Sequence, residues 1–416
     1  MRYTMTAGDL DPSFGTSGKV SIDFGAISIA NAVAVQTDEK LVLAGRVGDV
    51  STGDFGVARL RRNGGLDTTF GTGGKVVLAL SGSEDVARAV AVQSDGKIVV
   101  GGLTNSEPTG DIAVARLNPD GTLDAGFGSG GVAVYDISGP TGDAIRGMVI
   151  QPDGKILGVG AAGADAGLIR LNPDGSLDTT FAGGAGKEAV SLGNAGHLFA
   201  LALLSTGKFL VAGFDTTTLT QDDFLLARFN ADGSLDTTFG SSGIVRTDFN
   251  GLNDLAFALA VQSDGKIVLG GDTDSTDPVG ISGDVKAGWT RYDSAGSLDT
   301  TFGTAGKTQI NPTVLGDGVR GLALQSDGKI VAGGFIGETT GLTSFADPVA
   351  GDFAVYRLNT NGTPDTTFGV GGAVRTDFAG LGDGGRAVTL QAANRIVLVG
   401  GATTNHLNFA AARYKT

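Results

Sequence analysis

Short runs of apolar residues alternate with clusters of Gly, Asp, Asn and Ser along the whole chain. A representative stretch contains four such runs, at 88–93, 97–102, 112–118 and 131–136. Runs of this length, rich in Val, Ile, Leu and Ala and bounded by turn residues, are typical of buried β-strands and are short for helices. The pattern therefore predicts an all-β protein.

Two turn signatures separate these runs. Asp95-Gly96 lies between the first and second runs, and Asn118-Pro119-Asp120-Gly121 follows the third. Asp-Gly supplies the positive φ angles that a tight hairpin requires, whereas Pro fixes φ at the start of a turn and Gly allows the return. Each unit is therefore predicted to be an antiparallel meander of four strands.

A Leu-Asp-x-x-Phe motif gives the number of units. Its last copy has Pro364 in place of Leu. The motif phenylalanines are Phe14, Phe70, Phe127, Phe181, Phe239, Phe302 and Phe368. A period of roughly 55 to 65 residues with strand-like content is typical of propeller blades rather than of helical solenoids. The sequence therefore predicts a seven-bladed β-propeller with four antiparallel strands in each blade.

The first and last runs predict how the ring closes. Residues 18–24 have the pattern of an outer strand, and residues 409–414 have that of a third strand. Pairing this N-terminal outer strand with three C-terminal strands would complete the last blade and remove exposed strand edges. Residues 1–416 then form one domain, with blades at approximately 31–80, 88–136, 146–192, 199–249, 257–310, 320–378, and 386–414 plus 18–24.

Composition and charge narrow the classes of function. With 71 Gly, 10 Pro and 41% hydrophobic residues, the chain has frequent turns and enough apolar residues for a large core. A net charge of −14 disfavours nucleic acid and anionic lipids as partners and favours cations or basic partners. The absence of Cys excludes disulfides and thiol chemistry. We expect no membrane insertion, and the first residues lack the apolar core of a signal peptide.

Two charged residues recur in every blade. Arg116 in the third strand precedes the motif residue Asp124, and strand pairing across the turn would bring the two together as a bidentate ion pair. Seven equal copies suit a structural role, so we expect these pairs and the motif phenylalanines to join the blades. The turn partly resembles a calcium loop, but Arg116 stands where the first acidic ligand belongs, which argues against Ca²⁺ there.

The first strand of each unit has small residues such as Ala89 and Ala91, which fit where seven blades converge, so we place it innermost. At its entry an Asp is followed by an Arg in four units, and the Asp recurs alone in a fifth. This position would lie at the mouth of the axial channel. The candidate ligand-binding residues are Asp85, Arg88, Asp143, Arg146, Asp254, Asp317, Arg320, Asp383 and Arg386. They could hold an ion, a sugar or a charged ligand, or alternatively form ion pairs between neighbouring blades.

Loop length is the one asymmetry among the units. The connections between second and third strands are long at 272–288 and 335–352, in adjacent blades and on the face of the channel mouth. Variable loops on a rigid scaffold often carry function. The candidate metal ligands are Asp272, Asp274 and Asp277. They suit Ca²⁺, with a solvated acidic loop as the alternative.

The only tryptophan, Trp289, follows the first of these long loops. Its counterparts in the other units are apolar, so we expect it to pack between blades. A platform for stacking a sugar is the alternative.

The repeats resemble the delta-60 repeat family of bacterial β-propellers. The resemblance rests on segments such as Asp236-Thr237-Thr238-Phe239-Gly240 and Asp264-Gly265-Lys266-Ile267-Val268, and it covers nearly the whole chain. It implies a propeller fold and an extracellular or cell-surface location, but no particular chemistry. Leu204-Ser205-Thr206-Gly207 and Ala392-Ala393-Asn394-Arg395 depart from the repeat, and we expect less regular turns there.

These observations favour a non-catalytic binding or interaction scaffold, exported or on the cell surface, that uses one loop-rich face for a protein or glycan partner. No catalytic constellation is recognised, and no cofactor is expected apart from the candidate Ca²⁺. One alternative is a carbohydrate-active lyase or glycosidase that uses carboxylates near the axis. Another is a purely structural module of a larger adhesin.

Overall fold

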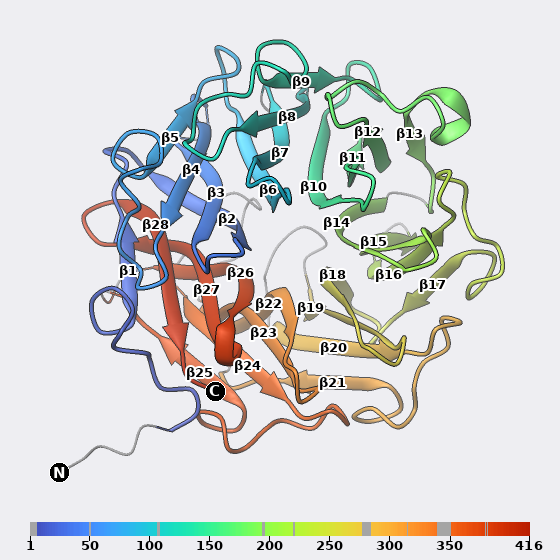
Figure 1. Cartoon of the computed structure of the whole chain (residues 1–416). Helices are drawn as coiled ribbons and strands as arrows, with labels where there is room; N and C mark the ends of the chain where they lie inside the picture. The colour runs from blue at the N-terminus through green and yellow to red at the C-terminus, as the bar shows by residue number, and fades with distance from the viewer. Residues whose placement is uncertain are drawn as a thin grey trace.

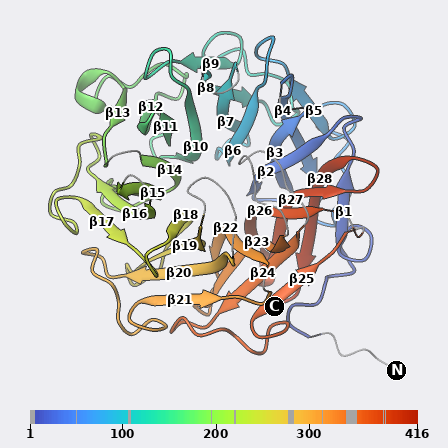
Figure 2. The same cartoon turned by 180° about the vertical axis from the view of Figure 1, so that it is seen from behind.

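The computed structural model describes residues 6–49, 51–105, 109–193, 196–218, 221–276, 284–313, 315–338, 351–378, 380 and 382–416. Seven four-stranded antiparallel sheets stand around a common axis (Figures 1 and 2). The predicted seven-bladed all-β propeller is therefore confirmed. Within the described residues, no helix is long and apolar enough to cross a membrane.

Each blade runs from an innermost first strand to an outer fourth strand. The inner strands are β2 (Ser28–Val35), β6 (Val86–Val92), β10 (Asp143–Ile150), β14 (Gly196–Leu203), β18 (Asn253–Val261), β22 (Gly316–Leu324) and β26 (Asp383–Gln391). The second strands are β3 (Leu41–Val47), β7 (Ile98–Thr104), β11 (Ile156–Ala162), β15 (Phe209–Thr218), β19 (Ile267–Ser275), β23 (Ile330–Glu338) and β27 (Arg395–Thr403). We number the blades one to seven in this order.

The third and fourth strands of each blade lie farther from the axis. The third strands are β4 (Asp54–Leu60), β8 (Asp111–Leu117), β12 (Asp165–Leu171), β16 (Gln221–Phe229), β20 (Lys286–Tyr292), β24 (Asp352–Leu358) and β28 (Leu407–Tyr414). The outer strands are β5 (Lys75–Leu78), β9 (Val132–Tyr135), β13 (Lys187–Val190), β17 (Ile244–Thr247), β21 (Lys307–Ile310), β25 (Ala373–Thr376) and β1 (Lys19–Ile22). Two short 3₁₀ helices complete the elements, η1 (Ala182–Gly184) and η2 (Ala392–Asn394).

Blade seven is closed by both ends of the described chain. Strand β1 pairs antiparallel with β28, with Lys19 opposite Ala412 and Ile22 opposite Phe409. The contact extends beyond the predicted strand, because Leu10 bridges to Tyr414 and the amide of Gly8 donates to the carbonyl of Lys415. The N-terminal segment therefore supplies both the last turn and the outer strand of this blade.

The hydrophobic core lies in layers between successive blades. One layer joins Val42 and Phe55 of blade one to Ala87 and Ile98 of blade two, with the motif residue Phe70 among them. All seven motif phenylalanines are fully buried. Trp289 is also fully buried and meets Tyr356 of the next blade edge to face, with ring centroids 5.6 Å apart. The predicted packing role of Trp289 is confirmed.

A repeated ion pair joins each blade to the next, and we call it the blade-linking unit. In blade two, Arg116 Nε donates to Asp124 Oδ2 at 2.7 Å, and Lys97 reaches the same oxygen at 2.9 Å. The guanidinium lies 4.7 Å from the centre of the Phe127 ring, and its Nη1 donates to the Pro173 carbonyl of blade three. The predicted pair is therefore present but is not bidentate, because the guanidinium divides its donors between two blades.

The same unit recurs around the ring. The pairs are Arg59 with Asp67, Arg116 with Asp124, Arg170 with Asp178, Arg228 with Asp236, Arg291 with Asp299, Arg357 with Asp365 and Arg413 with Asp11. A backbone bond accompanies it, from the amide of Gly71 in blade one to the carbonyl of Asp120 in blade two at 2.8 Å. Equivalent bonds continue around the ring to the one from Gly369 to Ala7, at 3.4 Å. The chain end thus takes part in the last link.

The two turns expected to be irregular behave differently. The turn at Leu204 keeps the usual pattern, because the amide of Leu204 donates to Lys208 and that of Gly207 donates to Leu204. The other turn forms η2, in which Ala393 and Asn394 have φ of 62° and 58°. Without the Gly that most other units place here, that turn adopts a left-handed backbone with other residues, as blade one does with Glu39. The prediction was wrong for the first turn and right for the second.

The meander gives the propeller two distinct faces. The turn face carries the connections from first to second and from third to fourth strands, such as 93–97 and 118–131 in blade two. The loop face carries the connections from second to third strands and from blade to blade, such as 136–142 between blades two and three. Inner strands begin on the loop face, and they start a few residues earlier than predicted, as β10 does at Asp143.

Candidate functional site

Every inner strand carries a β-bulge at the same place, near the loop face. In β10 the pairing register with β11 shifts between Ile145 and Gly147, so Arg146 is the extra residue of the bulge. A bulge re-aims the side chain of the extra residue. The seven bulge residues, which we call the axial ring, are Asn31, Arg88, Arg146, Phe199, Phe257, Arg320 and Arg386.

The axial ring surrounds one cavity of about 100 Å³. The described residues that line this cavity are the seven members of the ring, one from each blade. Their side chains are half-buried or buried, with Arg146 at 9% and Phe257 at 7% exposure. Four arginines thus converge on the axis of a protein whose net charge is −14.

Arg320 is neutralised by a carboxylate of the preceding blade. Its Nη1 lies 2.7 Å from Oδ1 of Asp272 on β19, and its guanidinium lies 4.0 Å from the ring centre of Phe257 and 4.9 Å from that of Phe335. Burial raises the pKa of Asp272, although Arg320 opposes this shift. Arg320 therefore forms an ion pair with the neighbouring blade, which was the alternative to a ligand-binding role in the sequence prediction.

Blades four and five form an aromatic side of the ring. The rings of Phe199 and Phe257 meet edge to face, with centroids 4.8 Å apart, and Phe199 also stacks on Phe214. Arg146 places its guanidinium 4.6 Å from the centre of the Phe199 ring. Arginine and aromatic side chains stabilise one another in this geometry.

The candidate aspartates at the strand entries do not line the cavity. Asp85 is fully buried and accepts hydrogen bonds from the amides of Leu80 and Ser81 and from the hydroxyls of Ser81 and Thr104. Asp143, Asp254, Asp317 and Asp383 accept equivalent bonds from the loops that precede them. The last three also accept bonds from amides at the end of the second strand, those of Asp274, Gly337 and Thr403. The predicted ring of Asp and Arg is thus divided, because the aspartates fix the loop between blades whereas the arginines face the axis.

Burial dominates the electrostatics of three of these aspartates, Asp254, Asp317 and Asp383. Burial raises the pKa of Asp254 to about 7 and those of Asp317 and Asp383 to about 6. The hydrogen bonds from backbone amides lower these pKa values, but by less than burial raises them. Nearby carboxylates add to the shift, Asp274 for Asp254 and Asp352 for Asp383.

The predicted calcium site is not formed by the described residues. Asp272 pairs with Arg320, whereas Asp274 pairs with Lys286 at 2.7 Å and accepts hydrogen bonds from Asn250. Both carboxylates lie in or at the end of a strand and already face cations or amides, which compete with a metal ion. Asp277 lies outside the described residues.

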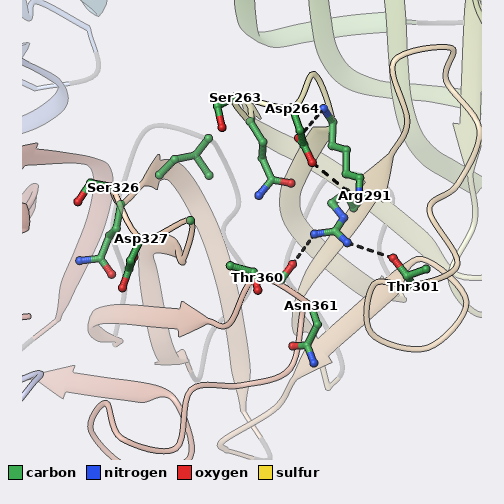
Figure 3. A pocket seen from close by; sticks show the side chains of 13 residues that line it. Ser263, Asp264, Arg291, Thr301, Ser326, Asp327, Thr360 and Asn361 are labelled. Carbon is green, nitrogen blue, oxygen red and sulfur yellow. Dashed lines mark hydrogen bonds and ion pairs between the residues drawn. The ribbon is translucent and has the colours of Figure 1, made fainter.

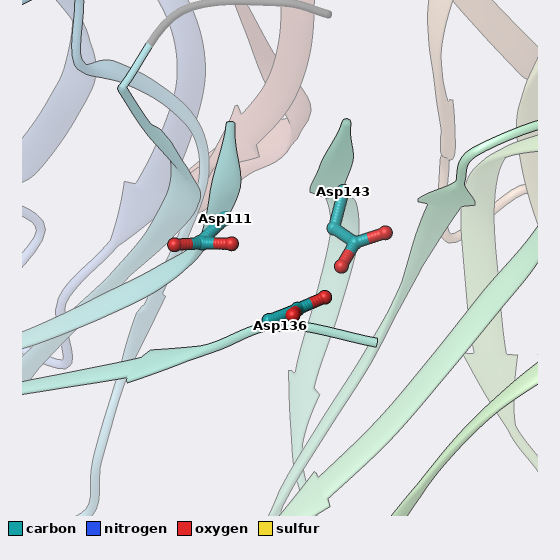
Figure 4. Close-up of side chains that lie close together, drawn as sticks. All are labelled: Asp111, Asp136 and Asp143. Atoms are coloured by element: carbon teal, nitrogen blue, oxygen red, sulfur yellow. The ribbon is translucent and has the colours of Figure 1, made fainter. Parts of the chain in front are cut away.

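Among the residues that the structure describes, three acidic triads occur on the loop face, and none was predicted as a group. They are Asp111 with Asp136 and Asp143, Asp223 with Asp248 and Asp254, and Asp352 with Asp377 and Asp383. Figure 4 shows the first, in which the carboxylates turn toward one another from three strand ends. Within each triad the ligand atoms lie within 4.8 Å of one another. Because an acidic cluster alone does not define a metal site, we assign no ion to them.

A groove of about 740 Å³ lies on the turn face between blades five and six (Figure 3). Its wall includes Arg291, which donates to the Thr360 carbonyl and to Thr301, and Lys266, which pairs with Asp299. These are members of the blade-linking unit, which every blade repeats. The groove is therefore explained by the structural repeat.

Sequence reasoning missed three members of the axial ring, Asn31, Phe199 and Phe257. An Asp followed by an Arg was the signal used, and blades one, four and five lack the Arg. A comparison of the seven inner strands could have found them. Small residues flank this one position in most units, while the residue itself changes between Asn, Arg and Phe.

Comparisons with known proteins agree with this fold. The model of the family described as "Domain of unknown function (DUF5122) beta-propeller" matches residues 36–70, 93–127, 151–181, 204–239, 262–302 and 349–368. No curated protein matches the sequence at a significant level.

Among solved structures, virginiamycin B lyase from Staphylococcus aureus is similar with a TM-score of 0.54 and 12% identity, over 96% of this chain and 98% of that one. Sqt1 from Chaetomium thermophilum is similar with a TM-score of 0.52 and 14% identity, over 94% and 96%. At these identities the likeness concerns the fold alone. The matched segments and the seven sheets together identify the chain as a seven-bladed β-propeller built of tandem repeats similar to that β-propeller family.

Proposed function

We propose that this protein is a non-catalytic binding scaffold that takes its ligand on the axial ring, from the loop face. The observation that carries this proposal is the contrast between two sets of repeated positions. The Arg–Asp pair of the blade-linking unit recurs in every blade, whereas the axial ring places Asn, Arg or Phe at one equivalent position. The contacts that hold the blades together are repeated, whereas the residues around the cavity differ from blade to blade. This combination is typical of a rigid scaffold that binds a ligand.

The partner proposed from the sequence is a protein or a glycan. One similar structure is Sqt1 bound to the N-terminus of the ribosomal protein L10, with a TM-score of 0.50 and 12% identity. It supports the general idea that a propeller of this size can receive a peptide. The resemblance to the delta-60 repeats supports the further proposal that the protein is exported or lies at the cell surface.

An enzyme remains the second candidate because of Asp272. This buried carboxylate contacts a ring arginine, and burial raises its pKa, as in many groups that transfer protons. Glycosidases, however, use two carboxylates about 5 to 9.5 Å apart. The five loop-fixing aspartates are engaged by backbone amides or loop hydroxyls. Binding without turnover therefore accounts better for the described residues.

A ligand screen tests this proposal. Wild-type protein would be screened by thermal shift against peptides, glycans, metal ions and small charged and neutral molecules, and each ligand that raises Tm would be recovered and analysed by mass spectrometry. We expect stabilisation with the ligand unchanged, since a ligand that binds the folded state alone raises Tm. The stabilisation should be lost in Phe199→Ala and kept in Phe24→Ala, a matched half-buried Phe away from the axis.

Three outcomes would contradict the proposal. Chemical conversion of the ligand would identify an enzyme. Stabilisation that survives Phe199→Ala would place the binding site elsewhere. No stabilisation by any ligand class would favour the purely structural module.

The long loops provide a second test. Residues 277–283 and 339–350 lie outside the described residues, and the segments that flank them emerge on the loop face. Replacing both with short Gly-Ser connections should preserve Tm, because the blade-linking units are far along the strands on the other face. If these loops recognise the partner, its binding should be lost, and unchanged binding would reject that role.

A further inference from the structure

We propose that the groove between blades five and six on the turn face binds an elongated organic cation with ammonium groups at both ends, such as a linear polyamine. The groove and the axial ring lie toward opposite faces of the propeller, so this site is separate from the one in the proposed function. The structural repeat explains why the groove has this wall, and the side chains that line it determine which ligand it suits.

The groove has room for a whole small molecule. Its volume of about 740 Å³ lies within the roughly 300 to 1,000 Å³ that is usual for small-molecule pockets. Of the described residues that line it, none is aromatic, and Leu324 is the one with a large apolar side chain. Pockets for apolar ligands are lined mainly by hydrophobic and aromatic side chains. This groove therefore suits a polar ligand.

Two exposed carboxylates belong to separate hairpins that line the groove. Asp264 comes from blade five and Asp327 from blade six, and Figure 3 shows them apart from one another. The side chain of Asp264 is 57% exposed, and its Oδ2 lies 3.8 Å from Lys266 Nζ. The nearest lysine to Asp327 along the chain, Lys329, pairs instead with Asp365 at 2.8 Å. A ligand that meets both carboxylates must therefore extend from one blade to the next.

The cations of the groove are engaged by a third carboxylate. Lys266 Nζ lies 3.0 Å from Asp299 Oδ2, and Arg291 Nε lies 2.9 Å from the same oxygen. Arg291 also donates to the Thr360 carbonyl and to the Thr301 hydroxyl. The positive groups of the wall thus have partners within the protein, whereas the two exposed carboxylates are available to a cation. The net charge of −14 adds a long-range attraction for cations.

The corresponding surface between blades two and three differs in its polar groups. Pro152 and Pro173 stand there in place of two hydroxyl side chains of the groove, Ser326 and Thr360. The hairpin aspartate is kept as Asp153, with a lysine Nζ 3.7 Å from its carboxylate. Asp153 therefore has the same local setting as Asp264 without the same groove, which makes it a matched control.

Calorimetric titration with defined probes tests this inference. The diamine cadaverine is compared with pentylamine and pentanediol, which have one ammonium group and none on a similar chain. We expect cadaverine and spermidine to bind, less tightly at high salt, pentylamine to bind at least about fivefold more weakly, and pentanediol and maltotriose not to bind. An acetylated and amidated Lys-Gly-Lys peptide that binds more tightly than spermidine would identify a protein segment as the source of the ammonium groups.

Variants locate the binding. Asp264→Asn and Asp327→Asn should each weaken cadaverine binding by about fivefold, as expected for an exposed charge pair, and their effects should multiply in the double variant. Asp153→Asn makes the same change of charge outside the groove and should leave binding unchanged. An Asn oxygen can still accept the bond that each aspartate receives from a backbone amide, so the variants should fold. Circular dichroism and Tm would confirm this.

The results separate this inference from the proposed function. If neither cadaverine nor spermidine binds, or if Asp153→Asn weakens binding as much as Asp327→Asn, the cation site is wrong. Equal affinities for pentylamine and cadaverine would contradict a ligand that meets both carboxylates, and binding of maltotriose alone would identify a saccharide site. Phe199→Ala should leave amine binding unchanged, because Phe199 lines the axial ring. Either proposal can therefore fail while the other stands.

Discussion

The aspartates of the blade-linking unit and three aspartates of the loop face, Asp254, Asp317 and Asp383, have pKa values that shift in opposite directions. In the blade-linking unit, hydrogen bonds from Lys97, with those from Gly126 and Arg116, outweigh burial and lower the pKa of Asp124 to about 2. On the loop face, burial raises the pKa of Asp254 to about 7. The same side chain therefore serves as an ion-pair partner in one place and as a buried acceptor of backbone hydrogen bonds in the other.

At this scale we predict that Asp124→Asn destabilises the protein by about 2 kcal/mol, the typical value for a hydrogen bond to a charged group. The amide cannot neutralise Arg116 and Lys97, which both contact the carboxylate. Chemical denaturation would measure the loss. Asp95→Asn is the matched control, because Asp95 is exposed and only accepts from the Lys97 amide, which an Asn oxygen can also do. Equal effects of the two substitutions would contradict the structural role of the pair.

The two groups of aspartates also predict a stability maximum at mildly acidic pH. Carboxylates with a lowered pKa stabilise the fold above the unfolded value of about 3.9, and this contribution is lost as the pH falls toward 2. Asp254 behaves oppositely, because the folded state keeps its proton up to about pH 7 while the unfolded state loses it near 3.9. Its contribution is therefore lost as the pH rises through this interval.

The measurement is Tm as a function of pH. Wild-type Tm should be highest between about pH 4 and 6 and should decline toward pH 8. In Asp254→Asn, which has no proton to lose, the decline should be smaller. Identical slopes for the two proteins between pH 5 and 8 would show that Asp254 is ionised throughout this range in the folded state.

At the scale of the element, the turn after each third strand is shaped by the neighbouring blade. Gly121 has φ of +90°, and a Cβ atom there would lie 2.7 Å from the Gly71 amide nitrogen and 3.0 Å from Phe70 of the preceding blade. The absence of a side chain is therefore required by a close approach between blades as well as by the backbone angle.

Two glycines of blade two separate these causes. Gly130 also has a positive φ, +63°, but a Cβ atom there would meet nothing within 4 Å. We expect Gly130→Ala to cost about 1 kcal/mol, for backbone strain alone. Gly121→Ala should cost clearly more, because Gly71 or Phe70 must also move. Equal costs in a denaturation experiment would mean that the blades are not tightly packed at this turn.

The element scale also shows how far the sequence could lead. The strands, the tight turns and the pairing of Arg116 with Asp124 follow from local sequence patterns that recur in each of the seven repeats. The axial ring does not, because a bulge arises from the pairing of two strands and changes which residue faces the axis. The role of Asp85 was equally hidden, since its partners are backbone amides of a loop whose course the sequence does not specify.

At the scale of the whole molecule, closure depends on contacts between the two ends of the described chain. Arg413 pairs with Asp11 at 3.0 Å, and the amide of Lys415 donates to the carbonyl of Asp9. These contacts reproduce the turn that other blades form within one continuous segment, such as 118–124 in blade two. The third strand of this blade, β28, is therefore covered by an outer strand, as the third strands of the other blades are.

A circular permutant tests this description. Joining Thr416 to Thr6 through a short Gly-Ser linker and opening the chain between Asp174 and Gly175 moves the break from blade seven to the equivalent turn of blade three. We expect a soluble, folded protein with the far-ultraviolet spectrum of the wild type and a modestly lower Tm. A permutant that is insoluble or unfolded would show that the last turn is not equivalent to the others.

The blade-linking unit has a direction, and this has a consequence for the ring. Six of the seven arginines donate forward to a carbonyl in the turn of the following blade, as Arg59 does to Pro119 and Arg413 to Arg62. Neighbouring blades thus meet head to tail, through two different surfaces, as subunits do in cyclic assemblies. Because each blade carries both surfaces, units with different axial residues remain compatible as neighbours. The axial residue of one blade can then change, and the binding specificity with it, without any change in the contacts between blades.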